Sequence, residues 1–94
     1  MTIYNLNKKT AVLTTTYVMQ DGLPILYVSH DLDDEGGSIW QFHCGNGDYD
    51  MKKMLLVSLG SILNIDNELK GLHLEIGEEA TRLNKDAEWK IGLQ

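Results

Sequence analysis

The strongest strand signal in the chain is the segment Ser38-Ile39-Trp40-Gln41-Phe42-His43-Cys44. It combines β-branched and aromatic residues, which are enriched in β-strands. Because successive side chains of a strand point to opposite faces, Trp40, Phe42 and Cys44 share one face and the residues between them share the other. We therefore expect a strand over Ile39–Cys44 that places Trp40, Phe42 and Cys44 in the hydrophobic core.

The net charge of the chain is concentrated on both sides of this strand. Residues 31–50 hold six acidic residues and no Lys or Arg, whereas the whole chain has fourteen acidic and eight basic residues. The remainder is formally neutral, so the net charge of −6 belongs to this window. Its acidic residues are Asp31, Asp33, Asp34, Glu35, Asp48 and Asp50.

Two stretches rich in β-branched residues precede the segment Ser38–Cys44. Thr10–Met19 is rich in β-branched residues, and Leu23–Ser29 resumes this pattern after Gln20-Asp21-Gly22. A glycine in the connection allows the positive φ that tight turns often need. The sequence thus predicts a β-hairpin formed by these two stretches.

The stretch after the second acidic group is ambiguous between helix and strand. Apolar residues at helical spacing fit a helix within residues 50–63, but Leu55–Val57 also fits a short buried strand. Further on, Asp66 is predicted to cap a short helix at Asn67–Leu72. Alternating apolar residues then predict a strand or an extended segment over Leu72–Ile76.

The sequence predicts a second β-hairpin at the end of the chain. Ala80–Leu83 and Ala87–Ile91 are its predicted strands, and Asn84-Lys85-Asp86 is the turn between them. Trp89 is expected to point inward, because large aromatic side chains are mostly buried.

Together these segments predict an α+β fold. We expect a single domain over residues 1–94, consisting mainly of an antiparallel β-sheet of about five strands with one or two short helices. Residues 1–9 are polar and mixed, and they are predicted to form a loose arm or a short edge strand.

The composition narrows the classes of partner. An acidic chain is a poor match for nucleic acid, whose phosphates require Lys and Arg, and for anionic membranes. The longest apolar run is Met54–Val57, which is far too short to span a bilayer. Cys44 is the single cysteine, so no intrachain disulfide forms, and a cytoplasmic location is expected.

No catalytic residue is indicated. His43 and Cys44 are adjacent in a predicted strand and point to opposite faces, so they do not form a nucleophile–base pair. Glu75, Glu78 and Glu79 resemble paired acid–base carboxylates but fit a solvated surface, and Arg82 is expected to pair with Glu78 or Glu79.

No metal or cofactor site is indicated either. Asp31–Gly36 resembles the start of a calcium-binding loop, but Ser38 and Phe42 stand at the eighth and twelfth positions, where the motif needs an apolar residue and a glutamate. One cysteine and three scattered histidines lack the ligand spacing of a zinc site.

Several motifs occur in a distinctive order along the chain. They are the strand Ile25–Val28, the acidic loop, Ser38–Phe42 followed by Gly45, the segment Leu59–Asp66, and Ile76–Arg82. In this order the chain resembles a family of small bacterial domains of uncharacterised function, often grouped with immunity proteins of polymorphic toxin systems. The resemblance covers roughly residues 12–91 and implies a binding module without catalytic residues.

The expected function is therefore non-enzymatic protein binding, most concretely as an immunity-type inhibitor of a basic toxin domain. Clustered acids attract a cationic partner and raise its association rate. The predicted contact residues are Asp31, Asp33, Asp34, Glu35, Asp48, Asp50 and, as an aromatic anchor, Tyr49. The alternative is a small structural or accessory domain that self-associates through a strand edge or through Met51 and Met54.

Overall fold

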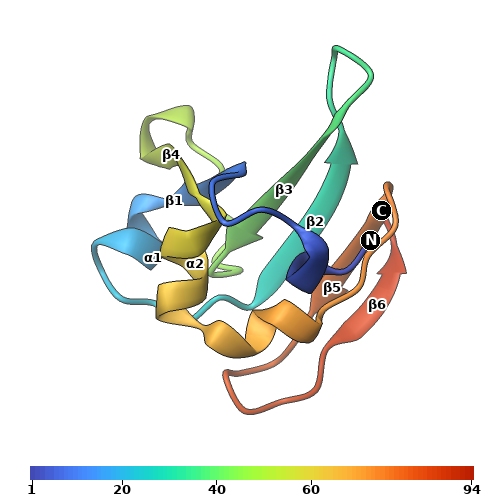
Figure 1. The fold of residues 1–94 in the computed structure, drawn as a ribbon. Helices are drawn as coiled ribbons and strands as arrows, with labels where there is room; N and C mark the ends of the chain where they lie inside the picture. Colours follow the sequence, from blue (N-terminus) through green and yellow to red (C-terminus); the bar gives the residue numbers. More distant parts are fainter.

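A computed structural model describes residues 1–94 (Figure 1). The α+β fold predicted from the sequence is confirmed, and the chain forms one domain around a mixed β-sheet. Its elements in chain order are η1 (Ile3–Asn5), β1 (Ala11–Thr15), α1 (Thr16–Met19), β2 (Tyr27–Leu32), β3 (Ser38–His43), η2 (Met51–Lys53), β4 (Met54–Ser58), α2 (Leu59–Ile65), η3 (Asn67–Gly71), β5 (Glu78–Thr81) and β6 (Lys90–Leu93).

The sheet has six strands in the order β4-β1-β3-β2-β5-β6, rather than the expected five or so. Neighbouring strands run antiparallel except β1 and β3, which are parallel with Leu13 beside Gln41. β3 confirms the strand predicted from the aromatic segment, and it lies inside the sheet between β1 and β2.

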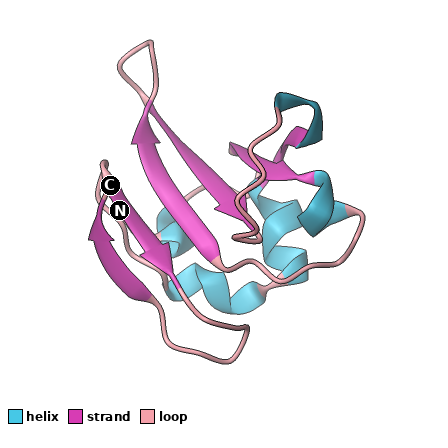
Figure 2. Cartoon of the chain, turned by 180° about the vertical axis from the view of Figure 1, so that it is seen from behind, coloured by secondary structure: helices cyan, strands magenta, loops and turns pink.

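The core lies between one face of this sheet and the helices α1, α2, η1 and η3, while η2 stands apart beside β4 (Figure 2). Trp40, Phe42 and Cys44 are all buried there, which confirms the predicted alternation in β3. The ring of Trp40 stacks on the buried His30 at a centroid distance of 4.2 Å. Trp89 packs half-buried against the edge of this core.

The predicted hairpin between Thr10–Met19 and Leu23–Ser29 is wrong. β1 ends at Thr15, whose hydroxyl accepts a hydrogen bond from Val18 N and caps α1. The chain then turns away, and β3 lies between β1 and β2 in the sheet. The β-branched residues therefore indicated a strand correctly, but the cap at Thr15 shortened it and tertiary pairing chose another partner.

Residues 50–63, for which a helix and a strand were both possible, contain one of each. β4 occupies Met54–Ser58 and pairs with β1, and α2 follows at once over Leu59–Ile65. Ser58 marks the change, because its hydroxyl accepts from Ser61 N and caps the helix.

Residues 66–93 confirm two of the predicted elements and differ from a third. A short 3-10 helix capped by Asp66 confirms the predicted helix, and β5 and β6 confirm the final hairpin with shifted bounds. Of the two alternatives for Leu72–Ile76, the strand does not form, because only an isolated bridge joins His73 to Thr2. The alternation still holds there, because Leu72 and Leu74 are buried.

The N-terminal segment lies against the domain instead of extending as an arm. Ile3 is buried, its N–H donates to Leu72 O at 3.0 Å, and Leu74 N donates to Met1 O at 3.0 Å. Burial of Ile3 and these two backbone hydrogen bonds together hold the segment against the domain.

Candidate partner-binding surface

The first acidic group lies at the tip of the hairpin formed by β2 and β3. The two strands pair from Tyr27 beside His43 to Leu32 beside Ser38, and the turn at residues 33–37 follows. This end of the hairpin projects beyond the rest of the sheet, at the top of the view in Figure 1. The tip is therefore accessible from several directions.

Asp33 holds the turn in one shape. Its Oδ1 accepts from Glu35 N at 2.8 Å and from Gly37 N at 2.9 Å, while Asp33 N donates to Gly37 O at 3.0 Å. Gly36 has a φ of 85°, a conformation that favours glycine. A Cβ at Gly37 would lie 2.9 Å from the Asp33 carboxylate, so a larger residue there would displace this carboxylate.

Three side chains at the tip remain free to meet a partner. Asp34 and Glu35 are exposed and accept no hydrogen bond from within the chain. Leu32 is 65% exposed, although it shares a strand face with the buried His30. Its position past the covered part of the sheet explains this exposure, and the sequence pattern alone did not single it out.

Asp31 lies at the base of the tip on the outer face of the sheet, opposite the core. Its Oδ2 accepts from Ser29 Oγ at 2.7 Å and from Gln41 Nε2 at 3.0 Å. Gln41 Oε1 in turn lies 3.0 Å from His43 Nε2. Asp31 is half-buried and serves this row of polar side chains, so it offers less free charge than Asp34 and Glu35.

The second acidic group follows β3 and is mostly engaged within the chain. Asp48 accepts from the Tyr17 hydroxyl and from Asp50 N, and these bonds, with nearby Lys53, hold the pKa of its carboxyl below the usual range. The same bond raises the pKa of Tyr17. Asp50 caps η2 by accepting from Lys52 N at 3.0 Å.

Tyr49 lies between these two acids, and its side chain is 56% exposed. Its ring meets His43 edge-on at a centroid distance of 5.2 Å, and Tyr27 approaches the same imidazole at 5.9 Å. Burial lowers the pKa of His43 below its usual value, although the charge of Asp31 partly opposes this effect.

The two acidic groups do not form one surface. The tip begins after the pair Leu32–Ser38, and the second group begins after His43 at the other end of β3. Five strand steps separate these ends, which is roughly 17 Å at the usual rise of a strand. The seven predicted contact residues therefore divide into a free tip and a structural loop.

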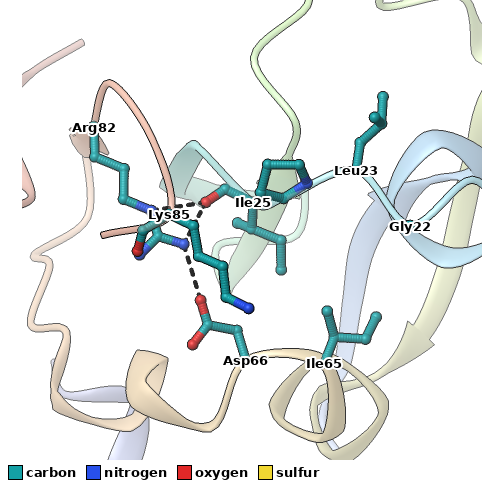
Figure 3. Close-up of a pocket in the computed structure, with 8 residues that line it drawn as sticks. Gly22, Leu23, Ile25, Ile65, Asp66, Arg82 and Lys85 are labelled. Atoms are coloured by element: carbon teal, nitrogen blue, oxygen red, sulfur yellow. Dashed lines mark hydrogen bonds and ion pairs between the residues drawn. The ribbon is translucent and has the colours of Figure 1, made fainter. Parts of the chain in front are cut away.

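The least exposed ion pair of the chain lies away from both acidic groups, beside a cavity of about 310 Å³ (Figure 3). Arg82 and Asp66 form an ion pair of 2.9 Å with side chains only 4% and 12% exposed. Arg82 also donates to Ile25 O and Lys85 O, and its guanidinium lies 4.3 Å from the Trp89 ring centroid.

The expected pairing of Arg82 with Glu78 or Glu79 is wrong. Arg82 lies just past the end of β5, and its side chain reaches the junction of α2 and η3 at Asp66. Because its hydrogen bonds go to the chain itself, Arg82 ties three segments together and presents no free cation to a ligand. The wide sequence separation from Asp66 left no local signal for this pair.

His43 and Cys44 do not form a nucleophile–base pair, as the strand alternation predicted. Cys44 is buried in the core, while His43 faces the opposite side of β3. No three His, Cys, Asp or Glu side chains converge as metal ligands do. None of the helices is long and apolar enough to cross a membrane.

Comparison of the chain with known protein families, with curated proteins and with solved structures finds no match.

Proposed function

We propose that this protein is a non-enzymatic binding module that recognises a basic protein partner through the tip of the β2–β3 hairpin. The observation that supports this proposal is the ordered turn at residues 33–37. It holds Asp34 and Glu35 free of internal partners, beside the exposed side chain of Leu32. A rigid turn loses little conformational entropy when a partner binds.

The chemistry of the tip favours a cationic surface with an apolar depression. Two free carboxylates attract Lys and Arg over a distance and accept charge-assisted hydrogen bonds at contact. Leu32 adds apolar area that becomes buried when the partner covers the tip. Asp31 and Asp33 contribute charge to the same end, but their hydrogen bonds mainly hold the hairpin in shape.

The most concrete partner is a basic toxin domain, which an immunity-type inhibitor would block. The resemblance in motif order and the acidic tip both support this choice. Asp48, Tyr49 and Asp50 belong to the proposal only as a secondary contact, because the two acids already serve the chain's own turns. A cytoplasmic location and independence of any cofactor are part of the same proposal.

The direct test uses as its probe the protein encoded by the gene immediately upstream, because an immunity-type inhibitor is expected beside the gene of its toxin. Isothermal titration calorimetry measures its affinity for the full chain and for the double variant Asp34→Asn, Glu35→Gln. A matched control is Asp86→Asn, Glu88→Gln, which removes the same charge from exposed residues in the β5–β6 connection. That connection lies at the opposite end of the molecule in Figure 1.

The proposal expects the tip variant to bind at least tenfold more weakly, as loss of charge-assisted contacts implies. The control variant should bind like the natural chain. Equal losses in both variants would reduce the effect to net charge and contradict a specific role of the tip. A natural chain that does not bind the probe contradicts the immunity-type partner.

A further inference from the structure

The strand β4 forms one edge of the sheet and pairs only with β1. Edge strands of soluble proteins are usually protected by Lys, Pro, bulges or a covering segment. The sequence of β4 is Met54-Leu55-Leu56-Val57-Ser58, with no charge, proline or glycine. Leu56 at its centre is 66% exposed. This edge therefore lacks the side chains that normally prevent further strand pairing.

The backbone of β4 also has groups directed to the free edge. Leu59 N donates to Thr10 O at 2.8 Å, which marks this residue pair as hydrogen-bonded. Bonded and non-bonded pairs alternate along an antiparallel ladder. The backbone groups of Val57 therefore face β1, whereas those of Leu56 and Ser58 point away from the sheet.

We propose that β4 pairs antiparallel with β4 of a second copy of this chain, about a two-fold axis at Leu56. In this arrangement, Leu56 N–H of each copy donates to Leu56 C=O of the other. Ser58 N–H of each copy donates to Met54 C=O of the other. The two Leu56 side chains lie side by side on the outer face and cover one another.

The end groups of β4 fit this arrangement. Met54 N–H already donates to Met51 O, so the backbone of Met54 offers only its carbonyl to the edge. Ser58 is the N-cap of α2, and the carbonyl of an N-cap residue accepts the first bond of its helix. Ser58 therefore offers only its N–H. Donor and acceptor thus match between the two copies, which favours a second copy over an unrelated peptide.

The opposite edge of the sheet is less suited to such pairing. β6 is one residue shorter, begins with Lys90 and contains Gly92, which lowers strand stability. It also lies beside the acidic residues Glu78 and Glu79 of β5. A pairing through β6 would bring these acids of two copies toward each other, and like charges repel.

The pairing of two β4 strands and the binding of a basic partner should depend on salt concentration in opposite ways. Each copy carries a net charge of −6, so the two copies repel, and added salt screens this repulsion. Self-association should therefore strengthen as the salt concentration rises. Binding of a basic partner at the hairpin tip should weaken under the same change.

Sedimentation equilibrium of the full chain from micromolar to millimolar concentration tests the inference. The natural chain should approach twice its monomer mass of 10.6 kDa at high concentration and more so at high salt. Leu56→Lys places two lysines opposite each other at the axis and should leave a monomer. Ile91→Lys makes the same change at an exposed position of the other edge and should associate like the natural chain.

Dilution of the natural chain, followed by amide NMR shifts, locates the contact without any variant. Shifts confined to residues 54–58 and their β1 neighbours would support the β4 pairing. A monomer at all concentrations would overturn it. Shifts centred on β6 or on the hairpin tip would overturn it as well, as would a Leu56→Lys variant that associates normally.

Discussion

At the scale of single residues, His43 couples the stability of the fold to pH. Its pKa is lowered by burial, so the unfolded chain binds a proton more readily than the folded one. Stability contributed by the neutral imidazole is thus fully present above the unfolded value of 6.5 and is lost as pH falls below it. Urea unfolding should show this loss between neutral and mildly acidic pH.

The variant His43→Gln isolates this effect, because Gln retains a polar side chain but does not titrate. The difference in unfolding free energy between the natural chain and the variant should decrease as the pH falls. A difference that is constant over this range would show that His43 titrates alike in both states.

Arg82 provides the second prediction at this scale. Replacing it with Met leaves the Asp66 carboxylate and the Ile25 carbonyl without their main donor. Breaking a buried ion pair in this way should lower the unfolding free energy by about 3 to 5 kcal/mol. Lys85→Met, at an exposed cation beside the same cavity, should change it by no more than about 0.5 kcal/mol.

Denaturant titration of both variants measures the two values. Similar small effects would mean that the ion pair contributes little beyond an exposed charge. The sequence showed both residues, but it could not pair them, because the contact depends on how β5 and the α2–η3 junction approach each other.

At the scale of elements, Asp33 orders the hairpin tip. Asp33→Ala removes the acceptor of two backbone N–H groups and should lower stability by about 1 kcal/mol. Amide exchange at Glu35 and Gly37 should accelerate, because their N–H groups lose this partner. Partner affinity should also decrease although Asp34 and Glu35 keep their charge, since the turn must then be ordered on binding.

A partner affinity that is unchanged in Asp33→Ala, despite faster exchange, would separate order in the tip from recognition. Asp86→Ala serves as a control, because it removes one exposed acid from the β5–β6 connection and should leave partner affinity unchanged.

The elements that were predictable are those with strong local signals. The alternation in β3 and the cap at Asp66 both follow from short stretches of sequence, and both occur in the structure. The hairpin assigned to Thr10–Met19 failed because pairing is a tertiary choice, and β1 joins β4 and β3 instead. Propensity indicates that a segment is a strand but does not select its neighbour.

The candidate site was predictable in composition but not in arrangement. The window of acids is plain in the sequence, and the structure divides it between two ends of one strand. Which acids remain free depends on the turns around them: Asp48 and Asp50 accept backbone N–H bonds, whereas Asp34 and Glu35 do not. The exposure of Leu32 likewise follows from where the covering helices end.

At the scale of the whole molecule, charge and apolar surface lie in separate places. The free acids are at the hairpin tip, and the uncharged edge is at β4, which β1 and β3 separate from β2 in the sheet. A basic partner at the tip and a second copy at β4 therefore use different surfaces. Both contacts respond to salt, but in opposite directions.

The most direct test of the central claim is the salt dependence of the association rate constant with the neighbouring gene product, measured by stopped flow. Electrostatic steering through the tip predicts a steep decrease of this rate with rising salt for the natural chain and for Asp86→Asn, Glu88→Gln. The decrease should be markedly shallower for Asp34→Asn, Glu35→Gln. Equal slopes in all three proteins would contradict recognition through the hairpin tip.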